Sequence, residues 1–294
     1  MAKLLLVFCV GFVRSSKGVP ISDILTTVAH RPWPLPSGRW AMTQHWNDLL
    51  FAHWPVGAEE LNALLPEGLV ADTFDGSAWV GIVPFWMDRI QMNGAPMVPG
   101  ANRFAELNLR TYVRQRNSNL AGVYFFSLDA ANPIAVAVAR MVFQLPYFWA
   151  RMSVKHHGDK DLQYSSERLF SRRPARFRAV YRSLGPTHAL EQSRPGSIEY
   201  FLTERYCLYT TDSRGELHQG NIHHLPWPLE RAEAEIEIND LPTAHGIRLP
   251  DVPPLLHYAR ELTVYVWNIE RVPMMHALRP TAAVAATKAW SRNL

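Results

Sequence analysis

The sequence predicts one large α+β domain whose strands form a mostly antiparallel, β-barrel-like sheet with a few helices. Three observations carry this prediction. Ten or more short segments have strand-like patterns, against two or three with helical spacing. The strand-like segments follow one another in runs rather than in strict βαβ alternation. Finally, 22 prolines against 16 glycines in 294 residues indicate many turns. Closing such a sheet removes its edges and can enclose a central ligand cavity.

The first elements follow from turn and helix-stop signals. Residues 57–65 carry leucines at helical spacing and end before Pro66, which predicts a short helix. Asp75-Gly76 predicts a hairpin turn between strands at 69–74 and 78–85.

The middle of the chain gives the clearest patterns. Residues 106–114 alternate between apolar and polar side chains, and residues 122–128 are continuously apolar, as in a strand buried on both faces. Asn132-Pro133 predicts a helix N-cap followed by proline at the first helical position, and Pro146 marks the end of that helix. Further strands are expected at 150–155, 162–166, 177–184, 206–210, 216–223, 232–238 and 262–269, with a short helix at 198–205.

Domain boundaries follow from where these patterns start and stop. Residues 41–275 are expected to form the single barrel domain, and residues 276–294 a C-terminal tail. Residues 1–40 are rich in proline and lack a sustained period, which predicts a poorly ordered leader or a start assigned too early. The ten apolar residues at 4–13 match a signal-peptide core in length, but they are too few to span a bilayer of about 30 Å as a helix.

Composition excludes several classes of protein. The net charge of +4 comes without a basic run, which argues against a nucleic-acid partner, and no segment is long and apolar enough to predict a membrane partner. Cys9 and Cys207 form no CxxC pair, so a cytoplasmic location is expected. The chain has no glycine-rich nucleotide loop, no GxSxG and no HExxH, so no cofactor is expected.

Two histidine pairs are the candidates for a metal site. His156-His157 and His223-His224 are each adjacent in sequence. Neighbouring side chains on a strand point to opposite faces, so neither pair can chelate one ion. No metal site is therefore predicted, although one histidine from each pair meeting in space remains the alternative.

The strand at 106–114 offers the best candidate for a site. Its polar face carries Glu106, Asn108, Arg110 and Tyr112, with roughly 7 Å between alternate residues. If this face looks into a cavity, Arg110 can clamp an anion, Glu106 can act as acid or base, and Tyr112 can donate a hydroxyl hydrogen bond. The alternative is a solvated sheet face with a cross-strand ion pair.

Seven segments carry distinctive motifs: HWNDLLFAHWPV (45–56), LLPEGL (64–69), DTFDGSAWVGIVPF (72–85), ELNLRTYV (106–113), VYFFSLDAANPIAVAVAR (123–140), LPYFWARMSV (145–154) and GNIHHLPWPL (220–229). These motifs resemble the YqjF-like family of uncharacterised bacterial proteins, and the resemblance covers about 41 to 273. That family in turn resembles the acetoacetate-decarboxylase-like superfamily, whose mostly antiparallel barrels hold a central small-molecule cavity.

The resemblance implies roles for individual residues. Glu106 stands at the place of the superfamily's pocket glutamate, and Arg140 matches an arginine of a Gly-Arg-Glu segment whose neighbours differ here. Tyr147 and Phe148 stand where the decarboxylases have their lysine pair, of which the first forms a Schiff base. The resemblance therefore implies the fold and the cavity, and argues against imine-forming decarboxylation.

Two further features bear on the candidate site: the lysines and the 220–229 motif. Of five lysines, Lys155 is the sole candidate nucleophile within the matched region, and it faces solvent if Met152 and Val154 face the core. His223 and His224 are expected to line the pocket mouth with Trp227 as a stacking wall, unless this segment is simply a strand end and loop packed on the core.

These observations favour a protein that binds a small organic acid or ketone-like ligand in an internal cavity. The first alternative is a lyase or decarboxylase-like enzyme without a Schiff base, with Glu106, Arg110 and Tyr147 as catalytic residues. The second is a scaffold whose cavity is filled by side chains. The ligand contacts are expected from Asn108, Tyr112, Arg140, His223 and Trp227, and a homo-oligomer is left open.

Overall fold

The computed structural model describes residues 21–94, 102–116, 118, 120–158, 161–186 and 194–272. The expected tail at 276–294 and the first half of the expected leader lie outside these residues. None of the helices within the described ranges has the length and apolar character needed to cross a membrane.

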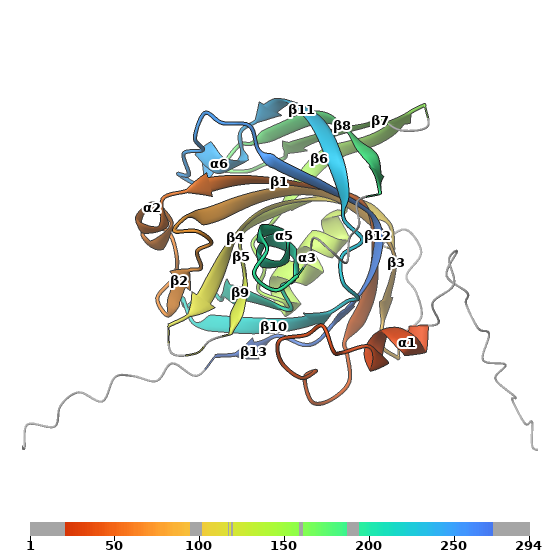
Figure 1. The fold of residues 1–294 in the computed structure, drawn as a ribbon, viewed down its shortest axis with the longest axis vertical. Helices are drawn as coiled ribbons and strands as arrows, with labels where there is room; N and C mark the ends of the chain where they lie inside the picture. The colour runs from red at the N-terminus through yellow and green to blue at the C-terminus, as the bar shows by residue number, and fades with distance from the viewer. Residues whose placement is uncertain are drawn as a thin grey trace, which may run out of the picture.

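Five short helices and 13 strands make up the described chain (Figure 1). The helices are α1 (Ile21–Thr26), α2 (Ala58–Asn62), α3 (Pro133–Val142), α5 (Ile198–Thr203) and α6 (Leu241–Ala244). The strands are β1 (Met42–Val56), β2 (Leu69–Ala71), β3 (Ala78–Met92), β4 (Phe104–Gln115), β5 (Ala121–Ala130), β6 (Tyr147–His157), β7 (Asp161–Arg168), β8 (Arg176–Pro186), β9 (Cys207–Thr211), β10 (Leu217–His223), β11 (Glu230–Asn239), β12 (Leu255–Val266) and β13 (Glu270–Arg271).

The strands close into two rings that share a wall. Nine strands form one closed path, in the order β4, β5, β6, β7, β8, β11, β12, β1 and β3. A second path of seven strands runs through β12, β1, β3, β4 and β5 and closes through β9 and β10. All pairings are antiparallel except β5–β6 and β5–β9, so the expected mostly antiparallel barrel is confirmed.

The shared wall of β1, β3 and β4 is buried on both faces. On β4, Leu107 and Leu109 pack into the apolar core of the nine-strand ring, while Glu106 and Arg110 point into the seven-strand ring. Both sets of side chains are at most 8% exposed. The polar face of β4 is therefore an interior surface and not a solvated one.

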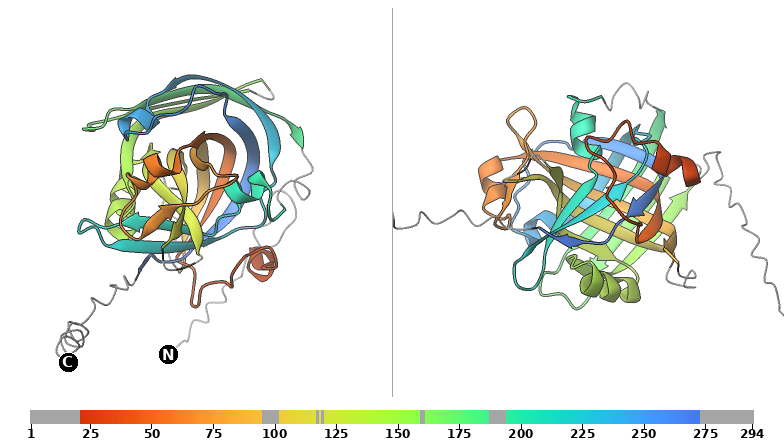
Figure 2. Two further views of the ribbon diagram at one scale, coloured as in Figure 1. Left: turned by 60° about the vertical axis from the view of Figure 1, so that its left-hand side comes forward. Right: turned by 90° about the horizontal axis from the view of Figure 1, so that it is seen from below.

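Helices α3 and α5 lie at opposite ends of the seven-strand ring, as the view from below shows (Figure 2, right). Asn132 caps α3 as predicted, because its Oδ1 accepts hydrogen bonds from the backbone N–H groups of Ile134 at 3.0 Å and Ala135 at 3.1 Å. The two helices thus limit the interior space to the length of the strands between them.

The predicted hairpin at Asp75-Gly76 is only partly correct. The turn exists, since Asp75 and Gly76 both have positive φ and Phe74 bridges Ser77. The flanking strands do not pair with each other, because β2 pairs with β4 while β3 pairs with β1 and β4.

Residues 21–40 differ from the expected poorly ordered leader. They lie against the outside of the barrel below β10 (Figure 1). Ile24 is buried with Tyr265 and Trp267, and Arg31 is 8% exposed and donates to the carbonyl of Ile222 at 2.8 Å. Tertiary contacts therefore hold this segment in place, and its proline-rich sequence did not predict them.

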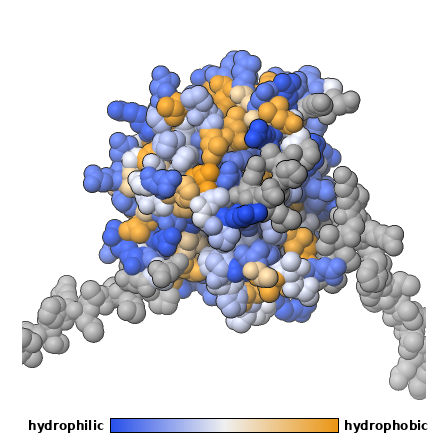
Figure 3. Space-filling view, in the orientation of Figure 1, coloured by the Kyte–Doolittle hydropathy of each residue, from blue (hydrophilic) through white to orange (hydrophobic). Residues whose placement is uncertain are grey.

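The outer surface carries both hydrophilic and hydrophobic residues. The face shown in Figure 3 carries hydrophilic residues interspersed with small hydrophobic patches. The large apolar and aromatic side chains are instead divided among several buried clusters, of which the largest fills the nine-strand ring.

Candidate functional site

The seven-strand ring encloses a cavity of about 380 Å³. Strands β1, β3, β4, β5, β9, β10 and β12 supply its walls, and α3 closes one end. Most of its surface is apolar or aromatic, with Trp46, Phe104, Phe125 and Trp227 among the lining residues. Ile134 is 65% exposed and Met92 is 41% exposed, which puts them on the rim.

Glu106 and Tyr147 form a hydrogen-bonded pair in the cavity wall. Tyr147 Oη donates to Glu106 Oε2 at 2.8 Å, and both side chains line the cavity. Burial raises the pKa of Glu106 to about 8, against the opposing effect of the Tyr147 hydrogen bond and with a further increase from the negative charge of Asp129. Near neutral pH, Glu106 is therefore mostly a neutral carboxylic acid.

Arg110 is the buried cation of the cavity. Its Nη2 donates to Tyr112 Oη and to the carbonyl oxygen of Leu202, each at 3.3 Å. Within the described ranges, Arg110 forms no ion pair with a carboxylate, and its Nε has no hydrogen-bond partner. The described residues therefore give this guanidinium no anionic partner, although it borders the cavity.

Asn108 lies between these two groups on β4 and also lines the cavity. Its side chain is 5% exposed, and its Oδ1 has no partner among the described residues. Glu106, Asn108 and Arg110 thus form a polar row along one wall, as the strand alternation predicts.

Tyr112 is the exception on this face of β4, because it is fully buried and does not line the cavity. Helix α5 covers it, with the ring of Phe201 5.4 Å from the Tyr112 ring between centroids. Tyr112 Oη lies 2.6 Å from His53 Nε2. The prediction that Tyr112 contacts the ligand is therefore not supported by its position.

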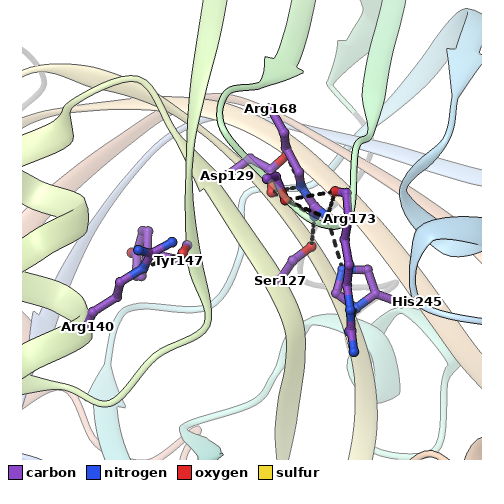
Figure 4. A network of polar contacts seen from close by, with 8 residues as sticks. Ser127, Asp129, Arg140, Tyr147, Arg168, Arg173 and His245 are labelled. Carbon is purple, nitrogen blue, oxygen red and sulfur yellow. Dashed lines mark hydrogen bonds and ion pairs between the residues drawn. The ribbon is translucent and has the colours of Figure 1, made fainter.

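Arg140 and His223 also lie outside the cavity. Arg140 Nε donates to the carbonyl oxygen of Tyr147 at 2.7 Å (Figure 4), so this arginine ties α3 to the start of β6. His223 points outward, where its ring contacts Arg31 at 3.1 Å and the carbonyl oxygen of Ile24 at 2.7 Å. Strand alternation turns its neighbour His224 inward instead.

Trp227 lies in the cavity wall as predicted. It is 3% exposed and packs edge-on against Phe51, with 4.9 Å between ring centroids. The loop 224–229 therefore carries the predicted aromatic wall.

Sequence reasoning missed three residues: Trp46 and Arg205, which line the cavity, and His53, which lies behind its wall. Arg205 is paired with Asp72 at 2.8 Å, a carboxylate that Arg114 also contacts at 2.6 Å. Burial lowers the pKa of His224 to about 4, so this ring is neutral near pH 7. Of the three missed residues, only His53 could have been found from the sequence, because it is a polar residue inside the apolar run 49–56.

A buried ion pair lies on the other side of β5 (Figure 4). Arg168 Nη2 and Asp129 Oδ1 are 2.8 Å apart with both side chains fully buried, and Arg168 also donates to Ser127 Oγ at 2.6 Å. His245 contacts the same guanidinium at 3.2 Å. This network joins β5, β7 and the end of α6 inside the nine-strand ring. It affects the cavity through the negative charge of Asp129, which raises the pKa of Glu106.

The described residues offer neither a cluster of metal ligands nor a lysine in the cavity wall. The described ranges contain no group of three His, Cys, Asp or Glu side chains that could hold a metal ion. Lys155 is exposed on β6, while Met152 and Val154 pack on the core of the nine-strand ring. Among the described residues, no lysine lines the cavity.

The fold is shared with acetoacetate-decarboxylase-like proteins. An acetoacetate decarboxylase from Legionella pneumophila matches with a TM-score of 0.53 at 13% identity, over 89% of this chain and 98% of that one. An acetoacetate decarboxylase-like enzyme from Sphingomonas wittichii RW1 matches with a TM-score of 0.55 at 13% identity, over 82% and 98%. The enduracididine biosynthesis enzyme MppR, complexed with the condensation product of pyruvate and imidazole 4-carboxaldehyde, matches with a TM-score of 0.56 at 10% identity, over 80% and 90%. At these identities the likeness shows the fold alone.

Sequence comparison defines the family more closely. The family DUF2071, described as an uncharacterised conserved protein, matches residues 43–263. The uncharacterised protein YqjF of Bacillus subtilis (strain 168) is 46% identical over 237 residues, which cover 81% of this chain and 95% of that protein. The chain belongs to the DUF2071 family.

Proposed function

We propose that this protein binds a small organic monocarboxylate in the cavity of the seven-strand ring, with Arg110 as the carboxylate clamp. One observation carries the proposal: Arg110 is 8% exposed, borders the cavity and forms no ion pair with a carboxylate in the described ranges. An unpaired buried charge is unfavourable by several kcal/mol, and a bound anion removes that penalty.

The charges around the cavity favour a ligand that carries a single negative charge. Arg205 has Asp72 as its partner, a carboxylate that it shares with the exposed Arg114, while Glu106 is mostly protonated near pH 7 and His224 is mostly neutral. Arg110 is left as the cation of the cavity lining that has no carboxylate partner among the described residues. A monoanion balances it, whereas a dianion would leave a second charge buried.

The lining of the cavity favours a ligand that has an apolar body and a neutral polar group. A cavity of about 380 Å³ lies in the lower part of the usual range for small-molecule sites, roughly 300–1,000 Å³. Aromatic rings from Trp46 and Trp227 flank the space, and Asn108 and Glu106 offer hydrogen bonds to a carbonyl or hydroxyl group. A keto acid or a hydroxy acid with an apolar body meets these requirements. The presence of the cavity also counts against a scaffold filled by side chains.

Calorimetric titration tests the proposal with 3-phenylpropionate, 4-oxopentanoate and succinate as the monocarboxylate and dicarboxylate probes. At least one monocarboxylate should bind, and its uncharged amide and succinate should not. Arg110→Gln should weaken binding about 10- to 150-fold, as expected for a hydrogen bond to a charged group. Arg151→Gln, on the exposed face of β6, is the matched control. Equal binding of the acid and its amide would contradict the proposal.

A second candidate is an enzyme that does not form a Schiff base. It is favoured by Glu106, whose pKa of about 8 keeps a proton available near neutral pH beside Tyr147. In this role Arg110 holds the substrate carboxylate, the ionised fraction of Glu106 takes a proton from the carbon beside the ketone, and Glu106 then returns a proton to the enolate carbon. Deuterium exchange at the α-carbon of a bound keto acid, followed by NMR, tests it. Exchange should be lost in Glu106→Gln while binding is retained.

Location and assembly stay predictions. A cytoplasmic location follows from the cysteine content and is tested by cell fractionation. A homo-oligomer is tested by sedimentation at several protein concentrations.

A further inference from the structure

His53 is a buried polar residue without an evident structural purpose. Its side chain is fully buried on β1, it does not line the cavity, and its Nδ1 has no partner in the described chain. Burying an imidazole is unfavourable unless hydrogen bonds to neighbouring groups compensate for the lost hydration.

The one hydrogen bond that the His53 ring makes with a described residue leads to the carboxylate clamp. His53 Nε2 lies 2.6 Å from Tyr112 Oη, and Tyr112 Oη lies 3.3 Å from Arg110 Nη2. A guanidinium only donates hydrogen bonds, so Tyr112 must accept from Arg110. The hydroxyl proton of Tyr112 has no other acceptor among the described residues, and the arrangement that uses it is donation to an unprotonated His53 Nε2.

Burial keeps this arrangement in one protonation state. Burial first, and then the positive charges of Arg110 and His257, lower the pKa of His53 well below 6.5. His257 itself faces Glu199 at 3.8 Å. A neutral His53 with its proton on Nδ1 has an acceptor at Nε2, whereas a protonated ring would offer two donors and would compete with Arg110 for the Tyr112 oxygen.

The sequence leaves room for His53 at this point. A Cβ at Gly81, on the neighbouring strand β3, would lie 2.9 Å from both Cδ2 and Nε2 of His53 and 3.5 Å from Arg110 Cγ. Real side chains do not approach so closely, so glycine at position 81 permits the contact between His53 and the clamp.

We propose that His53 is a positioning residue that acts through Tyr112 to fix the orientation of the Arg110 guanidinium toward the cavity. Tyr112 Oη and the Leu202 carbonyl oxygen hold Nη2, which fixes the guanidinium in the cavity wall. The inference rests on the proposed function only for its effect on affinity, because the hydrogen-bond chain exists without a ligand.

The first test needs no ligand. Long-range ¹⁵N–¹H NMR of the wild-type chain near pH 7 should show a neutral His53 ring with its proton on Nδ1. The rotation of the Arg110 guanidinium, followed by ¹⁵N exchange, should be slow in the wild type and faster in Tyr112→Phe and His53→Leu. His53→Gln, whose amide oxygen can accept at the position of Nε2, should restore slow rotation. A proton on Nε2, or unchanged rotation in both loss variants, would overturn the inference.

The second test uses 3-phenylpropionate or 4-oxopentanoate, whichever monocarboxylate binds the wild type. Tyr112→Phe and His53→Leu should each weaken binding about 2- to 12-fold, the value of one hydrogen bond. The double variant should be no weaker than the single ones, since both changes break the same chain. Tyr181→Phe is the matched control, because it removes a buried hydroxyl that bonds the Asp48 carbonyl oxygen at 2.9 Å outside the cavity.

The outcomes separate the two proposals. Additive losses from His53→Leu and Tyr112→Phe would overturn the positioning role while leaving the carboxylate site intact. If no monocarboxylate binds the wild-type chain, the proposed function fails, and the NMR measurements alone decide the role of His53.

Discussion

The ionisation of Glu106 links the cavity to the stability of the whole chain. Burial raises its pKa from 4.5 to about 8 in the folded protein. Between these two values the unfolded chain has released the proton while the folded chain still binds it. The free energy of unfolding therefore falls as pH rises, by about 1.4 kcal/mol per pH unit. Over the full interval Glu106 accounts for a loss of roughly 5 kcal/mol, and above about pH 8 the loss is complete.

The perturbation that isolates this effect is Glu106→Gln. The glutamine amide can still accept the hydrogen bond from Tyr147, but it cannot ionise. Urea unfolding of both proteins at several pH values gives the difference in stability, in which the titration of other groups cancels. Between about pH 5.5 and about pH 7.5 the variant should gain about 3 kcal/mol relative to the wild type.

A matched control is available on the outer surface. Glu233→Gln removes an exposed carboxylate of β11 that pairs with Arg182, and its difference from the wild type should stay constant over the same range. A constant difference for Glu106→Gln as well would refute the reasoning, because it would mean that Glu106 is ionised in the folded chain despite its burial.

Three further predictions test the fold and the chemistry. Relative to a chain that begins at residue 21, one that begins at residue 42 should melt at least about 5 °C lower by calorimetry, because residues 21–41 bury apolar surface on the barrel; equal melting temperatures would restore the reading of this segment as a leader. Borohydride with acetoacetate should give no stoichiometric adduct by intact mass, since Lys155 is exposed and no described lysine lines the cavity; an adduct at Lys155 would contradict this. Gly81→Ala should lower stability by about 1–3 kcal/mol in urea unfolding, because the new methyl group meets His53 at 2.9 Å; a neutral effect would show that His53 moves freely.

Local patterns in the sequence determined much of this protein. Asn132 and Pro133 were enough to predict the start of α3, because an N-cap is set by a few neighbouring backbone groups. Alternation along β4 correctly separated Glu106, Asn108 and Arg110 from Leu107 and Leu109, because strand geometry fixes which side chains share a face.

The tertiary structure alone decided what each face meets. Alternation says that His223 and His224 point in opposite directions, but only the packing of residues 21–31 on the outside makes His224 the inward one. Tyr112 shares its face with Arg110, yet α5, some 90 residues later in the chain, seals it from the cavity. The link from His53 through Tyr112 to Arg110 joins β1 to β4, and the two rings share these strands because β5 pairs with both β6 and β9. Such long-range pairings depend on the closure of the whole sheet, and no short stretch of sequence encodes them.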